Sequence, residues 1–339
     1  HGSGYFDGDG ENDLNNARVL RKVATKSYRP TAERLLALLE RHPQFRFALS
    51  LSGIAIEQLE RDAPDVIDLL RLLVATGRVE ILGETYYHSL AFFYSRSEFE
   101  RQVRPHADLV ERLFGVSPRI FRNTELSYTN ALGTWADAAG YRGILAEGWD
   151  PVLDWRSPNY VYRPPGARRA KLLLKNYRLS DDIAFRFSSQ AWEGWPLTSE
   201  KFGQWVKHTD GDTLNLFMDY ETFGEHQWED TGIFSFLEAM PGELLKDPNI
   251  VFSTPSDVIA LHEDRGEVDV PHVITWADTD RDLTAWLGNE LQQAAIGTLY
   301  GMEDRVQSSG NRALLEDWRR LPDRGLGRVS LGVESGDPA

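Results

Sequence analysis

The sequence contains no cysteine and no apolar run of about 18 residues, the length that a membrane-spanning helix needs. Without cysteine, the chain cannot form a disulfide, a thiolate zinc site or a cysteine nucleophile. No signal-peptide pattern stands at its start, so we expect a soluble, cytoplasmic protein. Basic residues are also few, since 37 Lys and Arg face 52 Asp and Glu, which gives a net charge of −15. This balance argues against nucleic acids and anionic membranes as partners, because both would be repelled.

The sequence has enough apolar material for a large core. Its 339 residues are 41% apolar and include ten Trp. This length suits one large barrel-type domain, or one domain with a helical appendage. A neutral polar ligand remains compatible with the acidic charge.

Short apolar segments alternate with amphipathic segments along most of the chain. This alternation predicts parallel βαβ units, and therefore either a barrel or a doubly wound sheet. The predicted strands are 45–51, 79–82, 119–121, 143–146, 214–218 and 251–253. The predicted helices are 14–39 (two helices meeting at Pro30), 63–75, 98–114, 135–139, 237–245, a helix that begins at 254–257, and 282–318.

An acid stands at or just beyond the end of several predicted strands, as Glu84, Glu125, Glu147 and Asp219 show. Because active sites of barrels lie at the carboxyl ends of the strands, this repetition favours a barrel. Residues 150–212 do not fit the alternation and are rich in Trp, Arg, Asp and Pro, so we predict a lid-like excursion over the barrel mouth. The predicted organisation is a catalytic barrel over 1–265 and a truncated helical region over 266–339.

The most informative stretch is 214–228, where an apolar run changes abruptly into acids, glycine, histidine and aromatics. Asp219 and Glu221 are two residues apart, so on an extended backbone both point to the same side. One could donate a proton to a leaving group while the other holds a hydroxyl. The competing interpretation is a solvated acidic turn, but the interleaved Tyr220, Phe223 and Trp228 favour a sugar site.

Four ordered segments resemble motifs of one enzyme family. Residues 121–126 (FRNTEL) and 218–226 (MDYETFGEH) closely resemble the third and fourth motifs of glycoside hydrolase family 57, in its α-amylase-like branch. Residues 77–82 are similar to the second motif, and residues 275–289 to a segment near the start of the helical region. The resemblance extends from about Tyr5 to about Leu321.

This resemblance implies an α/β fold, an incomplete parallel (β/α)₇ barrel of the TIM type followed by a C-terminal helical region. It implies a retaining hydrolase of α-1,4-glucans such as starch, glycogen or maltooligosaccharides, with no cofactor and no metal. Matching the motifs makes Glu125 the nucleophile and Asp219 the general acid/base. The further substrate-site positions that it implies are Glu80, Glu221, His226, Asp282 and Trp286.

Two more candidates come from their places in the sequence. His88 follows a predicted strand and could contact substrate, although a hydrogen-bonded structural histidine is an equal alternative. Trp228 could stack on a sugar face, and lid packing is the alternative for this residue.

The retaining mechanism sets physical requirements for the two carboxylates. They must lie about 5 to 5.5 Å apart across the scissile bond. The acid needs a raised pKa, which burial or the neighbouring Glu221 would supply. The nucleophile must stay ionised, and Arg122 is a plausible partner for it.

Several alternatives remain open at this point. The family's first motif, a His-x-Pro on the first barrel strand, has no counterpart here, which leaves open whether that strand is present and whether the chain is an impaired glucan-binding remnant. Transfer of glucan chains (4-α-glucanotransferase or branching activity) could use the same site. A metal-dependent deacetylase or α-mannosidase would need clustered ligands at strand ends, where only His88 and His226 lie.

Overall fold

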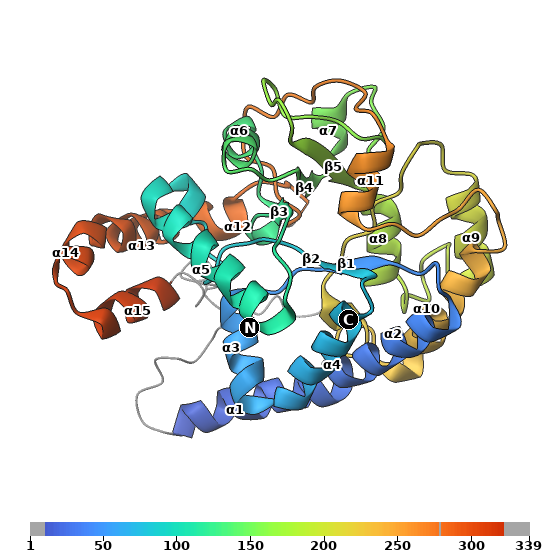
Figure 1. The fold of residues 1–339 in the computed structure, drawn as a ribbon, viewed down its shortest axis with the longest axis horizontal. Helices are drawn as coiled ribbons and strands as arrows, with labels where there is room; N and C mark the ends of the chain where they lie inside the picture. Colours follow the sequence, from blue (N-terminus) through green and yellow to red (C-terminus); the bar gives the residue numbers. More distant parts are fainter. Residues whose placement is uncertain (1–10, 278, 322–339) are drawn as a thin grey trace, which may run out of the picture.

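The computed structural model describes residues 11–277 and 279–321, and its described strands all pair in parallel. They are β1 (Phe47–Leu49), β2 (Val79–Ile81), β3 (Ile120–Arg122), β4 (Gly143–Glu147) and β5 (Lys171–Lys175). β1 pairs with β2, and β4 lies between β3 and β5. A bridge between Gly83 and Phe121 joins the two groups, so the strands follow one another in chain order at the centre of the molecule (Figure 1). This is an α/β fold with small parallel sheets.

Strand β5 corrects one expectation. Residues 150–212 were expected to be an excursion, yet Lys171–Lys175 pairs with β4 along its whole length, and α8 (Tyr177–Ala184) follows directly. The three leucines between the lysines are buried, so the segment is a short interior strand. Lys175 can end a buried strand because Glu147 and Asp181 lie 3.5 and 3.3 Å from its Nζ.

Two predicted strands do not form regular ladders. Residues 214–218 touch β5 through one bridge, Lys175 to Asn215. Side chains replace the missing ladder bonds: Asn215 Nδ2 donates to the Leu174 carbonyl at 3.0 Å, and the Ser180 hydroxyl accepts from Phe217 N at 3.2 Å. Residues 251–253 have no strand pairing within the described chain.

The N-terminal helices form one continuous rod, α1 (Glu11–Val23), the π-helical turn η1 (Ala24–Tyr28) and α2 (Arg29–Arg41). The junction expected at Pro30 is close to the real one. Pro30 lies in the first turn of α2, directly after the π-helical turn in which the regular helical hydrogen-bond pattern is interrupted. The first helix begins at Glu11, three residues before the predicted start at residue 14.

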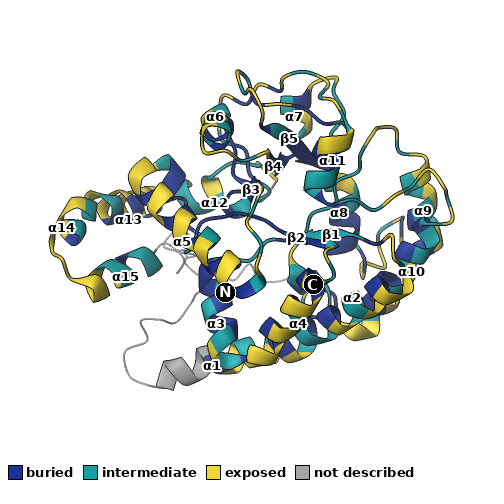
Figure 2. Ribbon diagram, viewed as in Figure 1, coloured by how far each residue is buried: buried dark blue, intermediate teal, exposed yellow. Residues whose placement is uncertain are grey.

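The other helices cover the strands with their buried faces inward and their exposed faces outward (Figure 2). Helices α4 and α5 end just before Gly77 and Gly115, whose φ angles of +70° and +68° suit a glycine stop. The helices with predicted counterparts are α4 (Pro64–Ala75), α5 (Arg96–Phe114), α6 (Asn130–Ala138), α10 (Ile233–Leu244) and α11 (Pro255–Leu261). The remaining ones are α3 (Gly53–Asp62), η2 (Ala91–Phe93), η3 (Thr124–Leu126), α7 (Asp150–Leu153), α9 (Ser199–Lys207), η4 (Tyr220–Thr222) and η5 (Glu229–Thr231).

The predicted C-terminal helical region is present over residues 284–320, and it extends to one side of the strands (Figure 1). It contains α12 (Thr284–Leu287), α13 (Glu290–Gly301), α14 (Glu303–Ser308) and α15 (Arg312–Arg320). The Arg319 guanidinium holds both oxygens of the buried Glu98 on α5, at 2.7 and 2.9 Å. No helix in the described part of the chain is both long and apolar enough to span a bilayer.

The rod also supports the acidic loop that follows residue 218. Thr31 Oγ1 donates to the Phe223 carbonyl at 3.2 Å, and Lys26 and Lys22 each lie 2.9 Å from Glu225. Gly224 approaches the rod so closely that an added Cβ would lie 2.0 Å from the Lys26 carbonyl oxygen. The acidic loop is therefore docked on η1 and α2.

We predict that Gly224→Ala destabilises the protein by about 1 to 3 kcal/mol through backbone strain, because its φ of +105° is unfavourable for any residue with a side chain. The clash of the new Cβ with the Lys26 carbonyl adds to this loss. Denaturant unfolding measures the change. Gly297→Ala in α13 is the control, since its Cβ meets nothing within 4 Å, and it should stabilise by about 0.5 to 1 kcal/mol. Equal stability of both variants would contradict this account of the loop.

Candidate active site

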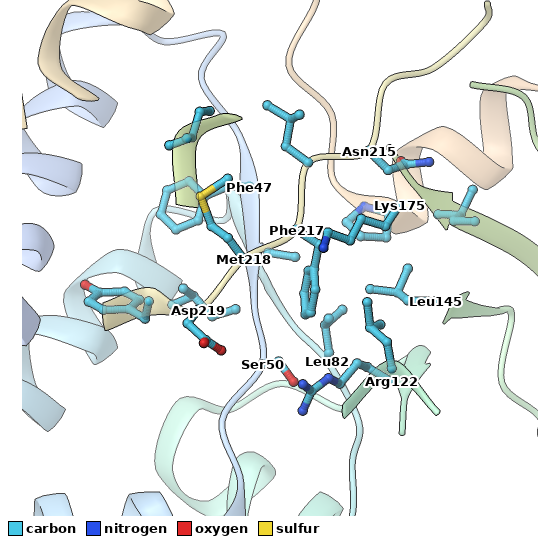
Figure 3. A pocket seen from close by; sticks show the side chains of 18 of the residues that line it. Phe47, Ser50, Leu82, Arg122, Leu145, Lys175, Asn215, Phe217, Met218 and Asp219 are labelled. Carbon is cyan, nitrogen blue, oxygen red and sulfur yellow. The ribbon is translucent and has the colours of Figure 1, made fainter. Parts of the chain in front are cut away.

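A cavity of about 1380 Å³ lies where the chain leaves the strands. Ser50 after β1, Glu84 after β2 and Glu125 after β3 line it, together with the acidic loop at Asp219. In Figure 3 the carboxylate of Asp219 and the guanidinium of Arg122 enter the same open space. The predicted nucleophile and acid therefore share one cavity.

Glu125 is held in a backbone conformation that non-glycine residues rarely adopt. Its φ angle is +57°, and that of the next residue, Leu126, is +52°. Hydrogen bonds around this turn maintain it: Leu126 N donates to the Asn123 carbonyl at 3.0 Å, and the Ser127 hydroxyl to the Thr124 carbonyl at 2.6 Å. Such strained residues are concentrated at functional sites, where the surroundings hold the side chain in place.

Both carboxylate oxygens of Glu125 have a partner. His88 Nε2 lies 3.1 Å from Oε1, and the Trp276 indole N–H donates to Oε2 at 2.7 Å. Burial alone would raise the pKa of Glu125, but the hydrogen bond and charge of His88, with Arg122 and Trp276, lower it well below its ordinary value. Glu125 is therefore an anion over the ordinary pH range.

His88 links Glu125 to a second carboxylate that the site prediction missed. Its Nδ1 lies 3.4 Å from Glu84 Oε1, and Arg122 Nη1 lies 3.3 Å from Glu84 Oε2. Burial would lower the pKa of His88, but the two glutamates raise it, so the imidazole is cationic. Glu84 was noted in the sequence as an acid at the end of a predicted strand but was not included among the site residues. Its place at a strand end was the feature that could have identified it as one.

Asp219 has the opposite environment. Its side chain is open to the cavity and makes no hydrogen bond to another described residue. The surrounding protein still limits its hydration, and this burial raises its pKa, as do the charges of Glu221 and Glu125. Asp219 is thus the carboxyl group of the pair that can retain a proton.

Four of the other predicted site residues also lie at the cavity. Its lining contains His88, Glu221, His226 and Trp286. Glu221 is buried and accepts a hydrogen bond from the Tyr28 hydroxyl on the N-terminal rod. His226 follows in the same loop, where its backbone N donates to the Glu221 carbonyl at 2.8 Å.

The structure does not bring Glu80, Trp228 or Asp282 to the cavity lining. Glu80 accepts hydrogen bonds from the backbone N and hydroxyl of Ser256 in the first turn of α11. Trp228 is 59% exposed, with the Lys26 ammonium 4.9 Å from its ring centre. Asp282 accepts from the backbone N and hydroxyl of Thr284 at the start of α12. We do not assign these three to the substrate site.

Among the described residues, no three His, Asp or Glu side chains are grouped so that they could bind a metal ion. The acidic residues instead fall into hydrogen-bonded groups with His88, Arg122 and Tyr28. Two carboxylates with opposite pKa shifts in one cavity are the arrangement that glycosidases use.

In a comparison with known protein families, residues 10–271 match glycosyl hydrolase family 57. The chain belongs to this family. The resemblance seen in the motifs is therefore confirmed.

A relative with a similar sequence supports this assignment. Over 300 residues the chain is 42% identical to a "Putative alpha-amylase" of Methanocaldococcus jannaschii, covering 88% of this chain and 64% of that protein. The chain thus spans about 64% of the length of this relative.

Solved structures show the same fold. A family 57 branching enzyme from Pyrococcus horikoshii has a TM-score of 0.66 at 16% identity, over 92% of this chain and 82% of that one. An alpha-amylase from Thermotoga maritima has a TM-score of 0.62 at 13% identity, over 94% and 85%.

We predict that Glu80→Gln lowers stability and leaves any catalytic activity of the folded protein unchanged. The lost charge-assisted hydrogen bonds to Ser256 are worth about 1.5 to 3 kcal/mol. Thermal unfolding and initial rates measure the two effects. Ser256→Ala should produce part of the same destabilisation. A rise in KM at unchanged stability would instead return Glu80 to the substrate site.

Proposed function

We propose that the protein is a retaining hydrolase of α-1,4-glucans, with Glu125 as nucleophile and Asp219 as general acid/base. The observation that carries the proposal is the contrast between these two carboxyl groups. They line one cavity, yet Glu125 has a lowered pKa and Asp219 a raised one. The 42% identity to a "Putative alpha-amylase" supports the glucan as substrate.

The proposed fold is an incomplete parallel (β/α)₇ barrel whose catalytic part extends to about residue 265. Support comes from the chain-order pairing of β1 to β5, with bridges at Gly83–Phe121 and Lys175–Asn215. In such a barrel the cavity would lie at the carboxyl ends of the strands.

In the first step, a Glu125 oxygen attacks the anomeric carbon as the glycosidic bond breaks. Asp219 transfers its proton to the departing glycosidic oxygen. The hydrogen bonds from His88 and Trp276 orient the attacking carboxylate, whose remaining lone pairs stay available for the new bond. The product is a covalent glycosyl ester on Glu125.

In the second step, Asp219 takes a proton from water, and the resulting nucleophile attacks the anomeric carbon and releases Glu125. The charge of Glu125 raises the pKa of Asp219 in the free enzyme. Esterification removes this charge, so the pKa of Asp219 falls just when the residue must act as a base.

The cavity suits an extended sugar chain. Its volume of about 1380 Å³ exceeds the range of about 300 to 1,000 Å³ that is usual for small-molecule sites. Phe217, Trp276 and Trp286 line it, and the rings of Phe217 and Trp276 lie 5.3 Å apart. Aromatic faces of this kind can pack against sugar rings, while Glu221 and His226 offer polar contacts.

We predict that the enzyme releases sugars from soluble starch and maltooligosaccharides. Glu125→Gln and Asp219→Asn should each reduce kcat by at least about 10²-fold, since one removes the nucleophile and the other the proton donor. Chromatography of the products measures the rate. No product from the intact enzyme, or undiminished product from Asp219→Asn, would defeat the proposal. Oligosaccharides longer than the starting material would assign glycosyl transfer to the same two carboxylates.

We also predict the direction of a pH shift. Activity requires protonated Asp219, so it falls as the pH rises through the pKa of this group. Glu221 raises that pKa, so Glu221→Gln should move the basic limb of kcat/KM to lower pH. Glu80→Gln, which changes the charge equally but outside the cavity, should leave the limb in place. A limb that stays or moves upward in Glu221→Gln would contradict the assignment of Asp219.

A further inference from the structure

Residues 275–277 and 279–282, called here the strap, lie against Glu125. The strap starts beside the pair of backbone hydrogen bonds between Ile274 and Tyr128, at 2.9 and 3.1 Å. Its two ends are tied to each other, because Thr275 N donates to the Arg281 carbonyl at 2.8 Å and its hydroxyl to the Asp282 carbonyl at 2.9 Å. The ends of the strap are therefore fixed in place.

The strap attaches to Glu125 at two points through one residue. Trp276 N donates to the Glu125 carbonyl at 3.1 Å, and its indole Nε1 donates to Oε2 at 2.7 Å. The ring is held between neighbours, with Phe217 5.3 Å away and the Arg122 guanidinium at 5.2 Å. One residue thus holds both the backbone and the carboxylate of Glu125.

Arg281 anchors the other end of the strap. Its Nη1 donates to Glu147 at 2.8 Å and to the Trp276 carbonyl at 3.0 Å, and its Nη2 donates to Asp181 at 3.2 Å. The side chain is only 12% exposed, and its backbone φ is +52°. A single guanidinium therefore joins Trp276 to two acids of the strand layer and α8.

The anchor forms part of a balanced group of buried charges. Lys175 lies 3.5 Å from Glu147 and 3.3 Å from Asp181, so two cations face two carboxylates. Removing a member of such a group leaves a buried charge without compensation. Burying these four charged groups costs free energy. This cost indicates that the group has a role beyond packing the strap against the protein.

We propose that Arg281 is a positioning residue that orients the nucleophile Glu125 through the strap and Trp276. The proposal rests on the function proposed above. The guanidinium fork reaches three acceptors at once, which the single ammonium of lysine cannot do in the same geometry. Arg281 is not among the residues that line the cavity. It acts by fixing the Trp276 indole, which in turn fixes the carboxylate.

The test compares Trp276→Phe, Arg281→Lys and the double variant by steady-state kinetics on a maltooligosaccharide. Trp276→Phe keeps an aromatic ring but removes the N–H, and Arg281→Lys keeps the charge but loses the fork. Each should lower kcat by up to about 10²-fold, the effect of a small misplacement of a reacting group, with KM little changed. The double variant should be no slower than the slower single variant, because both substitutions disturb the same chain of contacts from Arg281 through Trp276 to Glu125.

Arg178→Lys is the matched control, since Arg178 is 70% exposed and pairs with Asp150 on the surface, and it should keep wild-type kcat. Wild-type kcat in Arg281→Lys or in Trp276→Phe would overturn the proposal, and so would losses that add fully in the double variant.

If Arg281→Lys fails to fold, Asp181→Asn replaces it, because it weakens the same anchor and keeps an oxygen acceptor for Nη2. It should lower kcat in the same direction, and wild-type kcat would overturn the proposal. Glu125→Gln and Asp219→Asn distinguish a failure of the strap proposal from a failure of the proposed function. If both are inactive while the strap variants are unaffected, only the strap proposal fails. Undiminished activity of Asp219→Asn defeats the proposed function itself.

Discussion

The account depends on one constraint, which is that the carboxylates of Glu125 and Asp219 have different environments within one cavity. Glu125 receives a cationic imidazole and an indole N–H, so its charge is stabilised. Asp219 receives no such donor from the described residues and faces the charge of Glu221, so its neutral form is favoured. This asymmetry separates the pKa values of two otherwise similar groups, and the different tasks proposed for them rest on it.

The asymmetry requires support from distant parts of the fold. His88 can remain charged because Glu84 lies behind it, and Glu84 is in turn compensated by Arg122 at the end of β3. Glu221 is held by Tyr28 from the π-helical turn of the N-terminal rod. Buried charges of this kind contribute little net stability. Their value here is that each one fixes the position or the charge of a neighbour at the cavity.

The parts that follow from local pattern were predictable from the sequence. Helices α4 and α5 and strands β1 to β4 follow from the periodicity of the sequence, and the order of the motifs drew attention to Glu125 and Asp219. Strand β5 was not predicted, because three leucines between two lysines are too short an apolar run to indicate a strand. The acids that pair with Lys175 come close to it only in the folded structure. Trp276 and Arg281 also escaped assignment as site residues, since their partners Glu125 and Glu147 are 151 and 134 residues away. Glu80 fits a family motif, but only the fold shows that its carboxylate binds Ser256.

The covalent intermediate tests the central claim most directly. A fluorinated glucosyl fluoride, which forms the glycosyl ester faster than water can hydrolyse it, would be incubated with the enzyme and the labelled peptide identified by mass spectrometry. The account predicts one sugar per chain, carried on Glu125. A label on another carboxylate, such as Asp219, or an enzyme that turns over glucan without ever forming an ester, would contradict it.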